Sequence, residues 1–262
     1  MIITVNIENT KIYIGCAEES SGHIYFEDSI STDLNRTSAE YSIIIRQLLE
    51  LRKTPADDID GCILSSCVPQ ITETVKQAMD SVLGRGVIEV GPGIKTGVNI
   101  RIDDPTQLGG DMLVAAAAGI SEYGGPLCII ILGTAGAMFV LDKNNSFAGC
   151  LILPGLKVSI DSLTRTASEL PGAALRVPST IIGKSTVKAM QSGVIYGCAA
   201  SIDGLLDRIQ DELGYKVNTP VITGEFADMI APLCRHRLNV DPHLMMKGLI
   251  IIYNKNKRNQ TR

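Results

Sequence analysis

Two short turns in this sequence place threonine beside glycine or asparagine, a composition suited to holding a phosphate group. Gly133 and Thr134 follow an apolar run that begins at Cys128, and Asn9 and Thr10 follow the apolar run at the start of the chain. Glycine lets a backbone close around an anion while N–H groups and a threonine hydroxyl point toward its oxygens. The turns therefore predict phosphate binding, and a nucleotide held in a cleft between two similar halves would contact both.

Asp111 is the candidate for acid–base chemistry. It follows Gly109 and Gly110 at the start of an alanine-rich helix, after a long loop over residues 91–108. A loop of this length inside a compact domain is more often functional than idle. An aspartate at a helix N-terminus also complements the helix dipole, so position alone favours the structural explanation for Asp111.

The elements that must position these residues form two similar halves. Apolar runs separated by short polar turns predict an antiparallel three-stranded meander in each half, over residues 2–6, 11–17 and 23–27, and again over 128–132, 137–142 and 147–153. Helices alternate with short strands after each meander, which indicates an internal duplication. The predicted fold is α/β, with two ribonuclease-H-like halves, 1–120 and 121–262.

Helical spacing and capping residues predict the main helices. Thr37 and Glu40 form a capping box before a helix that extends to Lys53, and Gly84 ends a second helix. Further helices are expected over residues 156–170, 225–233 and 243–253, and a long one runs from the segment 182–186 to about residue 213. Gly193 and Gly197 on the long helix form a small-residue face that packs either inside the fold or against a second subunit.

The composition argues against several classes of function. The 262 residues have a formal net charge of −4, so nothing in the overall charge attracts nucleic acid or an anionic membrane. No secretion signal or apolar stretch of about 20 residues occurs, which predicts a cytoplasmic protein without a membrane partner. The seven cysteines are expected to be buried and reduced. The basic tail of Lys255, Lys257, Arg258 and Arg262 is interpreted as a frayed terminus.

Several motifs together resemble the type III pantothenate kinases. They are GPGIKTGVNIRIDDP from residue 91, the Gly-x-Asp at 109–111, Gly-Thr-Ala at 133–135, LILPG at 151–155, and IGKSTVKAMQSGVIYG from residue 182. The resemblance implies the fold of the superfamily of acetate and sugar kinases, heat-shock chaperones and actin. It also implies a homodimer that phosphorylates pantothenate in coenzyme A synthesis, with ATP, Mg²⁺ and a monovalent cation, K⁺ or NH₄⁺.

The resemblance also assigns roles by position. Asp111 matches the general base, and Thr186 matches a threonine that contacts pantothenate from across the dimer. The substrate-binding positions are Gly109, Gly110, Asp111, Met112 and Thr186, and the nucleotide-binding positions are Asn6, Glu8, Asn9, Thr10, Gly133 and Thr134.

The departures from the family pattern concern charge. The family's first turn reads Asp-x-Gly-Asn-Thr, whereas Asn6 and Glu8 stand in place of its aspartate and glycine. Ile131 occupies the position of an aspartate that helps to hold the monovalent cation, and Met112 replaces an arginine. No metal ligand is therefore predicted at Ile131. We expect Glu8 to repel the phosphates rather than to replace the lost carboxylate.

Three functions follow from this pattern. The first is a divergent subunit that needs a more complete paralogue to form an active kinase, as a heteromer. The second is a self-sufficient divergent kinase, supported by Asp111, Thr134 and Thr186. The third is a regulatory protein that binds pantothenate or a coenzyme A relative without chemistry. The net charge disfavours direct regulation of DNA.

Overall fold

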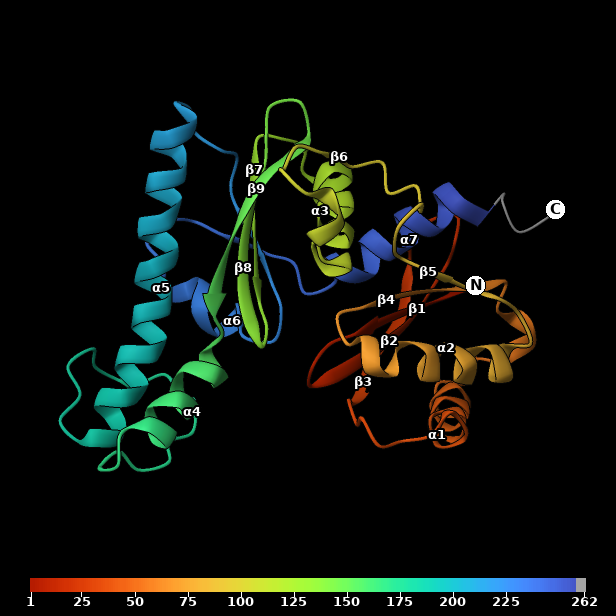
Figure 1. Cartoon of the computed structure of the whole chain (residues 1–262), viewed down its shortest axis with the longest axis horizontal. Helices are drawn as coiled ribbons and strands as arrows, with labels where there is room; N and C mark the ends of the chain where they lie inside the picture. Colours follow the sequence, from red (N-terminus) through yellow and green to blue (C-terminus); the bar gives the residue numbers. More distant parts are fainter. Residues whose placement is uncertain (258–262) are drawn as a thin grey trace. The chain divides into compact units, whose positions relative to one another are not determined.

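The computed structural model describes residues 1–257 and divides the chain into two compact units (Figure 1). Among the described residues, unit 1 contains 1–98, 103–121 and 244–257, and unit 2 contains 99–102 and 122–243. The last helix, which the sequence pattern assigned to the second half, therefore belongs to unit 1. Arg258 and Arg262 of the basic tail lie outside the described residues.

Unit 1 is built around a five-stranded sheet with the strand order β3-β2-β1-β4-β5. Its elements are β1 (Ile2–Ile7), β2 (Lys11–Ala17), β3 (Ile24–Ser31), α1 (Ser38–Leu51), β4 (Gly61–Ser66), α2 (Pro69–Leu83), β5 (Val87–Glu89), α3 (Gly110–Glu122) and α7 (Leu244–Asn256), with short 3₁₀ turns at Ala56–Asp58 and Pro105–Gln107. The first three strands are antiparallel, and β1, β4 and β5 run parallel. The predicted first meander is confirmed.

The alternation of side chains along β1 separates the two faces of this sheet. Ile3, Val5 and Ile7 join the core that β1 shares with α1 and α2. The opposite face packs on α7, where a Cβ on Gly15 would lie 2.6 Å from Met246, and where Gly61 leaves room for the Tyr253 ring. The odd and even positions of β1 thus face different helices.

Unit 2 repeats this arrangement with one added strand. Its elements are β6 (Asn99–Ile100), β7 (Leu127–Leu132), β8 (Ala135–Leu141), β9 (Ser146–Pro154), α4 (Leu156–Thr166), α5 (Thr186–Leu213), β10 (Val221–Thr223), α6 (Ala227–Ile230), a 3₁₀ turn at Ala231–Leu233, and β11 (Asn239–Val240). The strand order is β11-β10-β7-β8-β9-β6. Alternate residues of β7, namely Cys128, Ile130 and Leu132, form one core with α5 and α6. The predicted duplication is confirmed.

The predicted helix boundaries hold where the sequence contains a cap. The capping box of Thr37 and Glu40 is formed in both directions, and Gly84 ends α2 in the left-handed conformation with φ of 63°. Elsewhere the apolar spacing in the sequence overestimates the length of a helix. The segment predicted as a helix over 225–233 gives only the four residues of α6, because Pro232 then begins a 3₁₀ turn.

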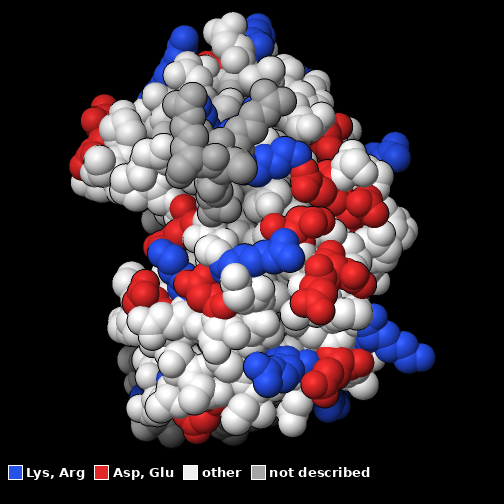
Figure 2. All heavy atoms as spheres, turned by 90° about the vertical axis from the view of Figure 1, so that its right-hand side faces the viewer, with Lys and Arg blue, Asp and Glu red and all other residues white. Residues whose placement is uncertain are grey.

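Surface properties agree in part with the sequence expectations. Among residues 1–257, no helix combines the length and the apolar character needed to cross a bilayer. Lys and Arg side chains are interspersed with Asp and Glu on the face drawn in Figure 2, and Lys257 is ion-paired with Glu19. All seven cysteines are free, but Cys67 and Cys150 are exposed, which corrects the expectation that the cysteines are buried.

Candidate functional site

Polar side chains gather in unit 1 where β1 and β4 end. Asn6 and Ser65 are register partners on these neighbouring parallel strands, and both are buried. The Asn6 amide donates to Glu8 Oε1 at 3.0 Å. The Ser65 hydroxyl has no hydrogen-bond partner among the described residues, and it lies 3.1 Å from the position that a Cβ on Gly110 would take. This edge of the sheet therefore adjoins the first residue of α3.

The turn between β1 and β2 is held by its own backbone. The Glu8 N–H donates to the Lys11 carbonyl oxygen at 2.9 Å, and the Glu8 carbonyl oxygen accepts a hydrogen bond from Thr32 Oγ1 at 2.6 Å. Asn9 and Thr10 are exposed, and the Asn9 amide points to Cys67 Sγ at 3.6 Å. The fixed turn thus carries a carboxylate and two exposed polar side chains.

Asp111 lies in the first turn of α3 and is held by the backbone. Its Oδ1 accepts a hydrogen bond from the Met112 N–H at 2.9 Å. A Cβ on Gly109 would approach this oxygen to 2.5 Å, so glycine is needed for the carboxylate to adopt this position. Burial raises the pKa of Asp111, and the backbone N–H donors offset this only in part. A more basic, fixed carboxylate is suited to accept a proton.

Cys67 joins this group, although the sequence did not single it out as a site residue. Cys67 as a residue is exposed, but partial burial of its thiol is the main cause that raises the pKa of this group to about 11, followed by the negative charges of Asp111 and Glu8. The two carboxylates are thus close enough to act on one thiol. The signal in the sequence was the position of Cys67 just past β4, next to the end of β1.

In unit 2, two glycines pack closely against the backbone around the turn between β7 and β8. A Cβ on Gly155 would overlap the carbonyl oxygens of Thr134 and Gly133, and a Cβ on Gly224 would lie 2.5 Å from the Leu132 carbonyl oxygen. Around Gly133 itself there is room, because the nearest atom to its Cβ position is 3.6 Å away. The turn is therefore tightly packed against Gly155 and Gly224, whereas a side chain at Gly133 would make only an ordinary contact.

Ile131 does not fit a cation. It pairs with Ala137 on β8 and with Thr223 on β10, and its buried side chain contains only carbon. Among residues 1–257, no three or more His, Cys, Asp and Glu side chains are arranged to hold a metal ion.

Thr186 is the first residue of α5 and is exposed. The Ser185 hydroxyl caps this helix by accepting a hydrogen bond from the Lys188 N–H at 3.4 Å. The preceding loop is fastened along the helix, since Gln191 donates to the Ala174 carbonyl oxygen at 2.7 Å and Ser192 donates to that of Ile181. Thr186 is therefore presented from a fixed helix end in unit 2, on a different element from the Gly133 turn.

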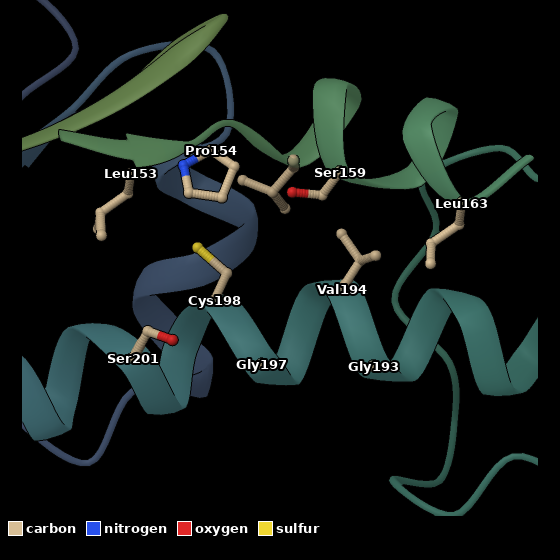
Figure 3. A pocket seen from close by; sticks show the side chains of 10 residues that line it. Leu153, Pro154, Ser159, Leu163, Gly193, Val194, Gly197, Cys198 and Ser201 are labelled. Atoms are coloured by element: carbon tan, nitrogen blue, oxygen red, sulfur yellow. The ribbon is translucent and has the colours of Figure 1, made fainter. Parts of the chain in front are cut away.

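An apolar groove of about 340 Å³ lies between α4 and α5 (Figure 3). The residues that line it include Leu153, Leu163, Val194 and Cys198, together with the two glycines on α5. Apart from their neighbours along α5, no described atom lies within 4 Å of the Cβ positions of Gly193 and Gly197. The small-residue face is therefore open within this chain, and internal packing does not explain it.

Comparison with known proteins decides the family. A family model for type III pantothenate kinases matches residues 2–208. The chain belongs to the type III pantothenate kinase family. A type III pantothenate kinase from an Exiguobacterium species is 35% identical over 98% of this chain and 100% of its own length, and one from Bacillus cytotoxicus is 36% identical over 98% and 97%. The resemblance inferred from the motifs is confirmed.

Solved structures place this family member in the fold of actin-like ATPases and sugar kinases. A putative Baf family transcriptional activator from Campylobacter jejuni has a TM-score of 0.59 at 16% identity, covering 98% of this chain and 99% of the other. The activator of 2-hydroxyisocaproyl-CoA dehydratase from Clostridium difficile, with bound ADPNP, has 0.57 at 12%, covering 99% and 96%. A putative N-acetylglucosamine kinase from Porphyromonas gingivalis has 0.52 at 15%, covering 98% and 100%. At sequence identities this low, the structural similarity shows a shared fold only.

Proposed function

We propose that this chain is a divergent subunit of a pantothenate kinase, which phosphorylates pantothenate with ATP and needs a more complete family member for full activity. The observation that carries the kinase assignment is Asp111. Its carboxylate is fixed at the start of α3, and burial raises its pKa. Pantothenate binds beside Gly109 and Gly110 in this proposal, and the missing side chain of Gly109 leaves the room that the Asp111 carboxylate occupies.

Asp111 accepts the proton of the pantothenate hydroxyl in this reaction. The freed oxygen forms a bond to the γ-phosphorus of ATP, and the bond from that phosphorus to the β,γ-bridging oxygen breaks, which releases ADP and the phosphorylated product. Catalysis of this kind depends mainly on positioning and on neutralising charge. The turns at Asn9–Thr10 and Gly133–Thr134 hold the phosphates.

The residues of this chain suit a Mg²⁺ ion but not a monovalent cation at the position of Ile131. Mg²⁺ prefers one or two carboxylates together with substrate phosphates. Glu8, the carboxylate of the first turn, would repel the phosphates when Mg²⁺ is absent and would lie beside the cation when it is bound. When bound, Mg²⁺ neutralises charge on the β- and γ-phosphates. A monovalent cation has no ligand at Ile131, whose side chain lacks a donor atom.

Dependence on a second subunit is supported by two features. Asn6 and Ile131 both lack the charge of the family's acidic residues. The groove between α4 and α5, with Gly193 and Gly197 open to approach, supplies a surface on which a related subunit can pack. In such an assembly the exposed Thr186 contacts pantothenate in the partner's site, and the partner supplies the cation site that this chain lacks.

A coupled assay of ATP consumption tests the proposal. The purified chain is measured with pantothenate, Mg²⁺ and K⁺ or NH₄⁺, alone and mixed with a type III kinase that has aspartates at the positions of Asn6 and Ile131. We expect turnover of the mixture to exceed the sum of the separate subunits. Asp111→Asn in this chain should lower the turnover that its own site contributes by about 10²- to 10⁴-fold.

Other outcomes identify the alternatives. Full turnover by the chain alone, lost in Asp111→Asn, would show a self-sufficient kinase that can also act as a homodimer. Pantothenate binding by calorimetry, with no turnover by the chain alone and no gain of the mixture over the added kinase alone, would instead show a regulatory binder.

A further inference from the structure

Asn256, the last residue of α7, is a buried polar side chain that binds a loop far away in the sequence. Its exposed fraction is 4%. Its Oδ1 accepts the Lys95 N–H at 3.1 Å, and its Nδ2 donates to the Lys95 carbonyl oxygen at 2.9 Å and to the Ile252 carbonyl oxygen at 2.7 Å. One side chain thus satisfies both backbone groups of Lys95, as a neighbouring strand would.

The loop that Asn256 holds leads from β5 to Asp111. Lys95 lies four residues after Gly91, where the loop begins, and the Lys255 side chain lies over Gly97, 2.8 Å from the position of its missing Cβ. Gly97 has φ of 78°, a conformation that other residues rarely adopt. Two consecutive residues of α7 therefore fix the first part of the loop.

The same helix also contacts α3, the helix that follows this loop. A Cβ on Gly248 would overlap the Val114 carbonyl oxygen, so α7 and α3 approach each other backbone to backbone. α3 carries Asp111 in its first turn. Because α7 is one rigid helix, it ties the start of the loop to the helix that presents the carboxylate.

We propose that Asn256 is a positioning residue for pantothenate binding, which acts by holding the loop at Lys95. The inference rests on the proposed function, in which pantothenate binds beside Gly109 and Gly110 at the end of this loop. The two hydrogen bonds at Lys95 are partly buried, so they contribute to holding the loop in one conformation. In the absence of the Asn256 side chain, the Lys95 backbone loses both partners, and the loop exchanges among several conformations.

The test compares Asn256→Ala with Asn254→Ala, an exposed asparagine two residues earlier on α7. Asn254 donates to the Glu19 carbonyl oxygen at 3.3 Å, outside this loop, and so serves as the matched control. Calorimetry measures the Kd for pantothenate and for ATP in each variant and in the wild-type chain. Hydrogen exchange follows the amides of residues 95–97.

For Asn256→Ala we expect about tenfold weaker pantothenate binding, unchanged ATP binding and faster exchange at Lys95. Asn254→Ala should match the wild type in all three. If Asn256→Ala does not fold, Asn256→Asp provides the test, because it keeps the acceptor for the Lys95 N–H and loses the donor to its carbonyl oxygen.

Equal pantothenate affinity in wild type and the folded Asn256 variant would overturn the inference alone. Equal losses for pantothenate and ATP would also overturn it, since they would indicate general destabilisation. Absence of pantothenate binding by the wild-type chain would overturn the proposed function, and this inference with it.

Discussion

Units 1 and 2 share a five-strand order, β3-β2-β1-β4-β5 and β9-β8-β7-β10-β11, to which unit 2 adds β6 beside β9. Their first hairpins nevertheless turn through residues of different character. In unit 2 the turn is Gly133 and Thr134, pressed from the inner side by Gly155. In unit 1 the corresponding turn carries Glu8, whose carboxylate accepts a hydrogen bond from the buried Asn6 amide.

The comparison shows that a turn can keep its backbone conformation while the charge on its side chains changes. Neither turn needs a special backbone conformation at the altered position, since Glu8 is not among the residues with positive φ. A glycine at position 8 can therefore be exchanged for glutamate at little cost to folding, while the charge presented to a phosphate changes by one unit. The hydrophobic frame is preserved, whereas the electrostatics of one turn are not.

The largest loss of stability is expected from a substitution at Gly155, where the backbone of unit 2 leaves no space for a side chain. Gly155→Ala would place a Cβ on the Thr134 and Gly133 carbonyl oxygens, and overpacking of this kind costs about 3 kcal/mol. Denaturant unfolding and ATP calorimetry should both show a loss.

Gly133→Ala is the matched control for that variant, because its Cβ meets no atom closer than 3.6 Å. We expect its free energy of unfolding to change by less than about 0.5 kcal/mol and its ATP binding to weaken. Equal stability of the two variants would contradict the packing described for this turn.

In unit 1 the comparison can be tested by removing the charge. Glu8→Gln retains an oxygen for the Asn6 amide and loses the carboxylate. ATP binding measured in EDTA should become roughly tenfold tighter, because a like charge near a phosphate costs about 1 kcal/mol or more. Added Mg²⁺ should reduce this gain, since the cation then neutralises Glu8.

Glu73→Gln on the exposed surface of α2 controls for the change in net charge, and it should leave the affinity as it is in the wild type. If Glu8→Gln binds ATP no more tightly than this control, Glu8 does not face the phosphates.

Cys67 reports whether a nucleotide contacts unit 1. Because partial burial and two carboxylates raise the pKa of its thiol to about 11, alkylation by iodoacetamide should accelerate roughly tenfold per pH unit below that value. ATP should slow the labelling of Cys67 and leave exposed Cys150 unchanged, as followed by mass spectrometry. Equal protection of both cysteines would indicate a global effect rather than contact with the turn.

The smallest effect concerns the stability of unit 1 as a function of pH. Burial raises the pKa of Asp111 above its ordinary value of 3.8 in the folded chain. The folded state therefore loses stability as the pH rises through the interval between the two values. Asp111→Asn removes this loss, so its thermal midpoint should exceed that of the wild type at pH 7.5, and the difference should vanish below about pH 4. A lower midpoint at pH 7.5 would show that the hydrogen bond to Met112 outweighs burial.

The sequence by itself determined the features that depend on neighbours along the chain. Alternating apolar runs gave both meanders, Thr37 and Glu40 gave the start of α1, and Gly84 gave the end of α2, because strand period and helix caps are local properties. The family motifs gave the fold and the candidate residues. The roles of Asp111, Thr186 and the two turns remain predictions.

Only the tertiary structure decided the contacts between distant residues. Asn256 lies 161 positions from Lys95 and Asn9 lies 58 from Cys67, and the approach of the Ser65 hydroxyl to Gly110 depends on how α3 meets β4. The placement of α7 in unit 1, against the chain order, is of the same kind. An apolar helix face fits either sheet equally well by composition, so the choice of partner is made by shape complementarity between packed surfaces, which no local pattern contains.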